Sequence, residues 1–275
     1  MEKNVLLKPI LKWVGGKRQL LDEIIPRIPE CSTYVEPFVG GGAVLLSLQP
    51  QKAIINDYNE ELMNVYVCVR DHPDELLDLL KIHAQRNSSD YFYSLRSEDR
   101  KQGFAELSRV EHAARVIYLN KTCYNGLYRV NAAGQFNSPY GRYKHPAIVN
   151  EPAIRALSKY LSKNVRLMSG DYACALKGLR KGAFVYFDPP YMPISSSSAF
   201  TGYTEGGFDF DEQLRLKEQC DVLASKGIHF LESNSDTPEI RELYKEYEIL
   251  TVNATRAINS KANRRGAISE VLIHG

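Results

Sequence analysis

The chain has 275 residues, of which 44% are hydrophobic and 25% charged, a composition typical of a globular protein that excludes a disordered or fibrous chain. Its longest apolar runs, residues 44–48 and 183–187, are far shorter than the roughly 20 residues of a transmembrane helix, and we expect no secretory signal. Five widely spaced cysteines, an odd number, argue against a disulfide framework or a zinc finger and favour a reducing cytoplasm.

The net charge of +2 is unevenly distributed along the chain. Residues 81–150 carry eleven Lys/Arg and five Asp/Glu (11 − 5 = +6), which leaves 24 basic and 28 acidic residues (24 − 28 = −4) elsewhere. A basic segment of this kind is attracted to a polyanion, because each neutralised phosphate releases counterions. On charge alone, an ordinary solvated basic surface is an equally good interpretation.

Hydrophobic patterning predicts strands that alternate with helices. A strand at 33–36 leads into a helix that begins at Ala43, and a second strand at 53–56 ends at Asp57. Further helices are predicted at 61–70, 73–85, 110–119 and 212–225, and further strands at 183–187 and 228–232. Ser195–Ser198 is expected to be a loop. This alternation favours an α/β fold with a parallel sheet covered on both faces.

The stretch between the second strand and residue 183 is too long for one crossover connection. We therefore expect a largely helical, basic insertion at 61–145. A β-hairpin is expected near 122–138, since the Asn125–Gly126 dipeptide favours a type I′ turn. The sheet domain is then discontinuous and consists of residues 1–60 and 146–275.

A glycine block, Glu36-Pro37-Phe38-Val39-Gly40-Gly41-Gly42, follows the first strand and precedes a helix. Glycine lets the backbone approach a ligand closely, and a helix N-terminus offers unpaired N–H groups. The block is not the dinucleotide fingerprint G-x-G-x-x-G, and Asp57 at the end of the next strand suits the ribose of a nucleoside without pyrophosphate. The alternatives are a plain tight turn for the glycines and, for Asp57, a helix N-cap supported by Glu60.

The most specific pattern is Asp188-Pro189-Pro190-Tyr191, directly after the apolar strand at 183–187. The two prolines lack N–H donors and end the strand, so a carboxylate, carbonyl groups and an aromatic ring meet at its carboxyl end. This combination suits an exocyclic amine, whose two N–H groups Asp188 and the Pro189 carbonyl would accept while Tyr191 stacks on the base. The alternative is a proline-rich turn, because Asp-Pro is a common turn pair.

Three other chemistries lack the residues that they need. No cysteine follows a proline, as the nucleophile of cytosine-C5 methylation would. The H-x-E and P-C-x-x-C motifs of a zinc deaminase are missing. Gly16-Lys17-Arg18 has neither the spacing nor the Ser/Thr of a P-loop, so nucleotide hydrolysis is not supported.

The basic insertion contains side chains of the types that read DNA. Tyr124 and Leu127 are candidate wedges, and Arg129 is a candidate partner of a guanine edge. The alternative is a hairpin that carries ordinary side chains.

Together these residues resemble the Dam-type family of DNA adenine-N6 methyltransferases, the D12 class with the alpha order of motifs. The resemblance extends over nearly the whole chain and rests on Lys12-Trp13-Val14-Gly15-Gly16-Lys17, the glycine block, Asn56-Asp57, Tyr124–Arg129, Phe136–Tyr143, Asp188–Tyr191, Phe200-Thr201-Gly202-Tyr203 and Ser233-Asn234-Ser235-Asp236-Thr237. In this family the target-recognition insertion lies between the glycine block and the D-P-P-Y block, which is the order found here.

The resemblance implies a Rossmann-like, S-adenosylmethionine-dependent methyltransferase sheet with an inserted, mainly helical DNA-recognition domain. The cofactor site that it implies consists of Trp13, Gly15, Lys17, Glu36, Pro37, Phe38, Gly40, Gly41, Gly42, Asp57, Asp171 and Asp188. The catalytic residues that it implies, which hold the flipped adenine, are Asp188, Pro189, Pro190 and Tyr191. The alternative for Trp13 is a core aromatic residue, and that for Lys17 is a charge on a helix surface.

The resemblance also implies a set of DNA contacts. Lys12 and Arg129 would read the two guanines, Tyr124 would intercalate, Leu127 and Pro139 would touch thymine methyl groups, and Asn125 and Arg142 would contact the backbone or flanking phosphates. This recognition block matches the family members that read GATC, so GATC is the expected target. Tyr128 is given no role.

The expected activity is transfer of a methyl group from S-adenosylmethionine to N6 of a flipped adenine in double-stranded DNA, without a metal. We expect a cytoplasmic monomer that binds no membrane and acts either with a cognate restriction endonuclease or as an orphan methylase. The alternatives are another short target, structured RNA, a DNA-binding regulator with a degenerate cofactor pocket, and protein glutamine methylation, which expects Asn in place of Asp188.

Overall fold

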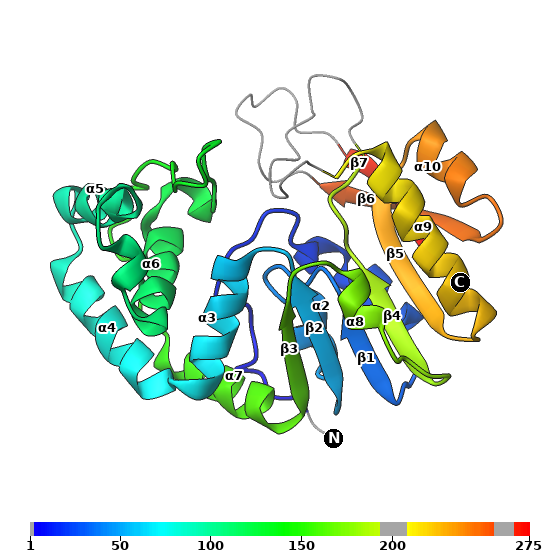
Figure 1. The fold of residues 1–275 in the computed structure, drawn as a ribbon, viewed down its shortest axis with the longest axis horizontal. Helices are drawn as coiled ribbons and strands as arrows, with labels where there is room; N and C mark the ends of the chain where they lie inside the picture. Colours follow the sequence, from blue (N-terminus) through cyan, green and yellow to red (C-terminus); the bar gives the residue numbers. More distant parts are fainter. Residues whose placement is uncertain (1–2, 193–207, 256–266) are drawn as a thin grey trace. The chain divides into compact units, whose positions relative to one another are not determined.

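The computed structural model describes residues 3–192, 208–255 and 267–275 (Figure 1). The strands are β1 (Thr33–Glu36), β2 (Ala53–Asp57), β3 (Val165–Ser169), β4 (Ala183–Phe187), β5 (His229–Ser235), β6 (Glu248–Thr255) and β7 (Ala267–His274). The α-helices are α1 (Leu21–Ile24), α2 (Ala43–Leu48), α3 (Glu60–Asp71), α4 (Pro73–Arg86), α5 (Ser89–Arg96), α6 (Arg109–Thr122), α7 (Glu151–Asn164), α8 (Ala173–Leu176), α9 (Phe210–Ser225) and α10 (Pro238–Leu243). Short 3₁₀ helices are η1 (Lys17–Leu20), η2 (Ile25–Arg27), η3 (Ser97–Arg100), η4 (Phe104–Glu106) and η5 (Tyr124–Gly126). The expected Ser195–Ser198 loop and the Phe200–Tyr203 block lie outside the described residues.

The seven strands form one sheet in the order β3-β2-β1-β4-β5-β7-β6 (Figure 1). β1 pairs in parallel with β2 and β4, and β4 pairs in parallel with β5. β7 runs antiparallel to both of its neighbours, β5 and β6. The predicted α/β fold with a Rossmann-like sheet is therefore confirmed, but the sheet is only mostly parallel, because β7 is antiparallel to its neighbours.

The central strands form because they are apolar enough to be buried on both faces of the sheet. All five residues of β4 are buried. Val185 and Phe187 of this strand belong to a core cluster with Phe230 of β5 and with Leu216 and Leu223 of α9. Each predicted strand and helix is present, with ends that differ from the predicted ones by at most three residues. β3, β6, β7 and the helices α1, α5, α7, α8 and α10 were not predicted.

The strand order reverses between β1 and β4. From β1 the chain proceeds outward to β2 and β3, and then returns to β4 on the other side of β1. The pairing of Thr33 with Ala183 and of Val35 with Val185 sets the two strands in register. In open α/β sheets, ligands bind at such a switch point, outside the carboxyl ends of the strands.

Internal contacts divide the chain into two compact units. The first unit consists of Met1–Gly16, Gly40–Gln49 and Glu60–Leu167, and the second unit consists of Lys17–Val39, Pro50–Asn59 and Met168–Gly275. The first unit is larger than the insertion expected at 61–145. One reason is that α7 packs against α3 and α4.

The first unit is built around α6, which packs against α3 and α4. Its side chains are buried over most of its length. A capping box starts the helix, since the Ser108 hydroxyl accepts the Glu111 N–H and the Glu111 carboxylate accepts the Ser108 N–H. α6 ends at Thr122, immediately before the segment that was predicted to read DNA.

Candidate functional site

Four strand ends of the second unit each carry a carboxylate. Glu36 ends β1, Asp57 ends β2, and Asp188 directly follows β4. Asp171 lies two residues beyond β3, whose end adjoins that of β2 because the Gly170 N–H donates to the Asp57 carbonyl at 3.0 Å. The order of the strands therefore sets Asp171, Asp57, Glu36 and Asp188 along one edge of the sheet.

Asp171 is engaged by an arginine of α9. The Arg215 guanidinium donates to both of its carboxylate oxygens, each at 2.8 Å, and also lies over the Tyr172 ring at 4.9 Å. These hydrogen bonds lower the pKa of Asp171. Any contact of Asp171 with a cofactor must share the carboxylate with Arg215, which the sequence analysis did not single out.

Glu36 and Asp57 are held locally. Glu36 is 2% exposed and accepts the Tyr34 hydroxyl at 2.9 Å. Asp57 Oδ1 accepts the backbone N–H of Asn59 at 3.0 Å, one residue before α3 begins at Glu60. This bond, from the N–H two residues further along the chain, forms an Asx turn that leads into α3.

Asn56, to which the sequence assigned no role, joins two loops at this edge of the sheet. Its Nδ2 donates to the Pro37 carbonyl at 3.1 Å and to the Gly170 carbonyl at 2.9 Å, and the residue is 1% exposed. Its Oδ1 is buried and accepts no hydrogen bond from the described residues. A buried amide oxygen normally has a donor, so this oxygen is a candidate acceptor for a ligand.

Phe38 forms part of an aromatic cluster beside these strand ends. Its ring centroid lies 5.0 Å from that of Tyr172, 5.9 Å from that of Phe208 and 6.5 Å from that of Phe187. The second unit thus places an apolar aromatic wall next to its row of carboxylates.

The glycines of the block belong to the first unit and are required there by internal packing. Gly40 and Gly42 have φ angles of +48° and +70°. A Cβ at Gly40 would lie 3.0 Å from Trp13 Cδ1, and one at Gly42 would lie 2.8 Å from the Tyr66 hydroxyl. That hydroxyl also donates to the Gly40 carbonyl at 2.9 Å. The glycine block predicted close approach of a ligand, whereas the close approach seen here is to Trp13 and Tyr66.

Within the first unit, Trp13 lies between this glycine block and Tyr128 of the segment that was predicted to read DNA. A Cβ at Gly41 would lie 3.4 Å from the Trp13 Cβ. The indole stacks on Tyr128 with a centroid distance of 4.9 Å, and Tyr128 packs edge-on against Phe136 at 5.6 Å. Gly15, with φ of +77°, has no atom within 4 Å of a Cβ built on it and so borders open space.

Asp188 is the centre of a charged cluster in the second unit. Lys17, which is 7% exposed, places Nζ 2.6 Å from Asp188 Oδ1, and the Ser233 hydroxyl donates to the same oxygen at 3.3 Å. The Lys17 ammonium also lies 4.5 Å from the centroid of the Tyr191 ring. The Tyr191 hydroxyl donates to Glu270 Oε2 at 2.7 Å. The alternative that Lys17 is a charge on a helix surface is therefore wrong.

The cluster perturbs the acidity of its members. Burial raises the pKa of Asp188, the Lys17 ammonium opposes this rise, and the Glu270 carboxylate adds to it. Burial also raises the pKa of Tyr191 well above its usual 10, which keeps its hydroxyl protonated. Perturbed carboxyl groups are typical of functional sites. Glu270 and Ser233 had no predicted role, and no motif marks Glu270.

The loop after β4, residues Asp188–Met192, is called the D-P-P-Y loop below. β4 ends at Phe187, directly before it, as the sequence predicted. The Pro190 carbonyl accepts the Gln213 amide N–H at 3.0 Å. Among the described residues no donor to the Pro189 carbonyl is found, so this carbonyl can accept a hydrogen bond from a ligand.

The predicted turn at Asn125–Gly126 is present in the first unit. The Leu127 N–H donates to the Tyr124 carbonyl at 3.3 Å, and φ is +58° at Asn125 and +65° at Gly126. Positive φ at both central residues is the pattern of a type I′ turn.

This turn does not join two paired strands. The antiparallel bridge in this segment pairs Val130 with Phe136 and closes around residues 131–135 instead. The Asn131 side chain stabilises that second reversal by accepting the N–H groups of Ala133 and Gln135. A second bridge pairs Cys123 with Tyr140.

Most of the predicted DNA contacts are exposed. Tyr124 is 56% exposed, and Lys12, Arg129, Pro139 and Arg142 are also exposed, whereas Asn125 and Leu127 are half-buried. The Arg129 guanidinium donates to Asn137 Oδ1 at 2.7 Å, which orients its planar group.

A buried asparagine of α6 holds two of these elements together within the first unit. Asn120 Oδ1 accepts the Lys12 N–H at 3.0 Å. Its Nδ2 donates to the carbonyls of Lys12 and Gly126, at 2.8 Å and 3.0 Å. The Lys12 backbone and the Tyr124–Leu127 turn are therefore tied to a single side chain.

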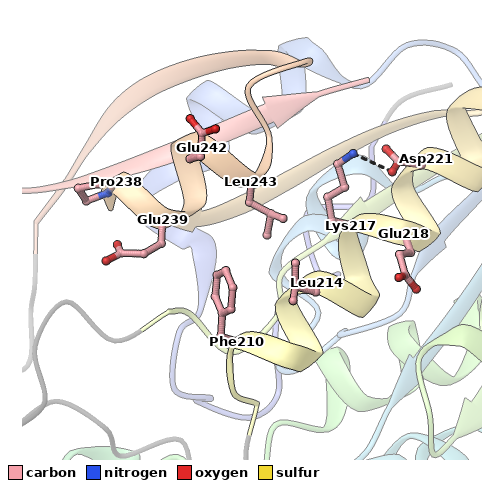
Figure 2. A pocket seen from close by; sticks show the side chains of 9 residues that line it. All are labelled: Phe210, Leu214, Lys217, Glu218, Asp221, Pro238, Glu239, Glu242 and Leu243. Carbon is pink, nitrogen blue, oxygen red and sulfur yellow. Dashed lines mark hydrogen bonds and ion pairs between the residues drawn. The ribbon is translucent and has the colours of Figure 1, made fainter.

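A separate hollow of the second unit lies between α9 and α10 (Figure 2). It is lined by Phe210, Leu214, Lys217, Glu218, Asp221, Pro238, Glu239, Glu242 and Leu243. None of these residues was predicted to act in the site.

The described residues contain no group of three or more His, Cys, Asp or Glu side chains that could hold a metal ion. Within the same residues, no helix is both long and apolar enough to span a membrane. The five cysteines are all unpaired thiols.

A Rossmann-like sheet with a carboxylate-rich edge, and with an acidic and aromatic loop at its switch point, defines an α/β protein with a candidate ligand site at that point. The family model for D12 class N6 adenine-specific DNA methyltransferases matches residues 13–258. The chain therefore belongs to this family.

Three relatives match over almost the full length of both chains. The chain is 47% identical to the Type II methyltransferase M1.LlaDCHI of Lactococcus lactis subsp. cremoris, covering 99% of this chain and 97% of the relative. It is 41% identical to the Type II methyltransferase M.MjaIII of Methanocaldococcus jannaschii, covering 97% and 98%. It is 33% identical to the DNA adenine methylase of Escherichia coli K12, covering 99% and 95%.

Proposed function

We propose that this enzyme transfers the methyl group of S-adenosylmethionine to N6 of an adenine flipped out of double-stranded DNA, within GATC. The observation that carries the proposal is the partly buried Asp188, held by Lys17 and Ser233 beside Tyr191 at the switch point of the sheet. Full-length relatives named DNA adenine methylase and Type II methyltransferase support the substrate class.

The residues of the second unit fit this cofactor chemically. S-adenosylmethionine carries an ammonium, two ribose hydroxyls and an exocyclic amine, all of which are hydrogen-bond donors. Glu36 and Asp57 at the strand ends and the unpaired buried Asn56 Oδ1 are acceptors, and the Phe38 cluster offers an apolar wall for its purine. We assign the ribose hydroxyls to Asp57.

Lys17, Pro37, Asp171 and Asp188 are the other residues of the second unit that we assign to the cofactor. For Trp13, Gly15, Gly40, Gly41 and Gly42 of the first unit, a cofactor role is what the family resemblance implies. When bound, the cofactor supplies an electrophilic methyl group on a sulfonium. No metal is then required, and the protein contributes positioning and electrostatics.

Asp188, Pro189 and Tyr191 hold the adenine in this proposal. Lys17 and Ser233 both engage Asp188 Oδ1, which leaves Oδ2 to accept one N6–H, while the Pro189 carbonyl accepts the other. Drawing both protons into hydrogen bonds localises the nitrogen lone pair for attack. Tyr191 stacks on the base, and its hydroxyl bond to Glu270 keeps the ring in place. Pro190 ends the strand and shapes the loop.

In this proposal residues 61–145 form the target-recognition insertion, which reads GATC. Lys12 and Arg129 read the two guanines, and Tyr124 fills the gap left by the flipped adenine. Leu127 and Pro139 touch thymine methyl groups, and Asn125 and Arg142 contact the backbone or flanking phosphates. The exposure of Tyr124 and the Asn137 bond that orients Arg129 support these roles.

We further propose that the enzyme acts as a monomer in the cytoplasm, because each strand of the target can be methylated singly. Action beside a cognate restriction endonuclease and action as an orphan methylase are both compatible with this activity. Another short target and structured RNA are the alternatives that the first experiment separates.

The test is transfer of labelled methyl from S-adenosylmethionine to an unmethylated GATC duplex, to its scrambled counterpart and to a structured RNA, followed by identification of the product nucleoside. Label in N6-methyladenine of the GATC duplex alone is the expected result. Equal label in both duplexes would refute the roles assigned to the recognition residues. Label only in the RNA would refute the assignment of DNA as the substrate. Asp188→Ala should abolish transfer while DNA binding persists, and substantial turnover by this variant would refute its role.

A further inference from the structure

Three polar side chains are fully buried beneath the D-P-P-Y loop, and none of them belongs to the site assigned above. Gln213 lies on α9, and Glu232 and Asn234 lie on β5; each is 0% exposed. Burying polar groups is costly unless they are hydrogen-bonded. Their partners therefore indicate why this polar cluster is kept in an apolar core.

The two amides hold the backbone of the loop on both sides of Tyr191. The Gln213 Nε2 donates to the Pro190 carbonyl at 3.0 Å. The Asn234 Oδ1 accepts the Met192 N–H at 3.2 Å. Because Pro189 and Pro190 have no N–H groups, the loop cannot be held by a regular strand ladder, and side chains from below take that role.

The two amides are also joined to each other. The Asn234 Nδ2 donates to Gln213 Oε1 at 3.0 Å and to Glu232 Oε1 at 3.0 Å. The carboxylate of Glu232 faces the nitrogen end of the Asn234 amide and so orients the oxygen end towards Met192. Ser235 adds a bond from its hydroxyl to the Met192 carbonyl at 2.8 Å.

We propose that Gln213 and Asn234 are positioning residues that fix the D-P-P-Y loop from beneath, and so fix Tyr191 and the Pro189 carbonyl against the adenine. The inference rests on the proposed function. It gives the Ser233–Thr237 block a role: Ser233 supports Asp188, and Asn234 and Ser235 support Met192 at the other end of the loop.

The test variant is Gln213→Met, which keeps the length of the side chain and removes both the N–H donor and the oxygen acceptor of its amide. Leu216→Ala is the matched control, because Leu216 is also fully buried on α9 but packs in the apolar core cluster. Measurements are the thermal unfolding midpoint, the kcat and KM of methyl transfer, and hydrogen exchange at the Tyr191–Met192 amides without cofactor or DNA.

We expect Gln213→Met to lower kcat at least tenfold with KM for DNA within about twofold, and to speed exchange at Tyr191–Met192 at least tenfold. Leu216→Ala should lower the unfolding midpoint without either effect. If Gln213→Met fails to fold, Ser235→Ala, which loses one hydroxyl, should still speed exchange of the same amides. Wild-type exchange at Tyr191–Met192 in the folded variant would overturn the inference. Absence of methyl transfer by the wild-type enzyme would instead refute the proposed function and leave the exchange result interpretable.

Discussion

The pH dependence of stability offers a sharp test of the polar core. Glu232 is fully buried, and burial raises its pKa from 4.5 to about 7, against the opposing influence of Tyr244, Asn234 and Cys220 around it. Since the folded state holds the proton more tightly than the unfolded state, the contribution of Glu232 to stability is greatest below about pH 4.5. It decreases as the pH rises towards 7.

The magnitude follows from the separation of the two pKa values. A difference between 4.5 and about 7, at about 1.4 kcal/mol per pH unit, corresponds to about 3 kcal/mol. Most of this change falls between pH 5 and pH 7. Glu232→Gln keeps the shape and the acceptor for Asn234 but cannot titrate, so the difference in stability between variant and wild type isolates this one carboxyl group.

The assay is urea unfolding from pH 5 to pH 8.5, followed by circular dichroism. The stability of Glu232→Gln minus that of the wild type should rise by about 2–3 kcal/mol across this range. Glu239→Gln, at an exposed position of α10, controls for the loss of one negative charge. A difference that stays constant with pH would show that Glu232 does not take up a proton on folding, and would refute the reasoning.

Three further predictions concern the site and its supports. The rate of methyl transfer should fall at acid pH as Asp188 is protonated. Lys17→Met should move this fall to higher pH, because the Lys17 ammonium lowers the pKa of Asp188. A pH–rate profile of the variant that coincides with that of the wild type would contradict this. Arg129→Ala should lose about 1–3 kcal/mol of discrimination at one guanine, measured as the ratio of kcat/KM for matched and changed duplexes. Gly42→Ala should destabilise the fold by about 1–3 kcal/mol, because φ is +70° and the new Cβ would meet the Tyr66 hydroxyl at 2.8 Å; an unchanged urea midpoint would count against this strain.

Motifs that combine local chemistry with a strand end could be located from the sequence. β4 and the two prolines after it predicted where Asp188 lies, because an apolar run must be buried and proline must end it. The Asn125–Gly126 turn followed from the preference of these residues for positive φ. The antiparallel bridges near the predicted hairpin close around residues 131–135 and not around this turn, because the Asn131 side chain accepts backbone N–H groups there.

Other parts of the site depend on residues that are distant in the sequence. Nothing local indicates that Lys17 is buried against Asp188, or that Glu270 of β7 accepts the Tyr191 hydroxyl. The same holds for Asn120, whose side-chain amide forms hydrogen bonds with the backbone of both Lys12 and Gly126. These contacts arise from strand order and helix packing, which sequence patterns specify only weakly.

The sequence by itself determined the α/β class, the positions of the main strands and helices, and the family, because these depend on periodicity and on short blocks of chemically distinctive residues. The tertiary structure decided which groups those blocks meet. It engaged Asp171 with Arg215, set Gly40 against Trp13, and placed the amides of Gln213 and Asn234 beneath the D-P-P-Y loop. The physical reason is that a buried polar group must find its partner wherever the fold brings one within hydrogen-bond distance.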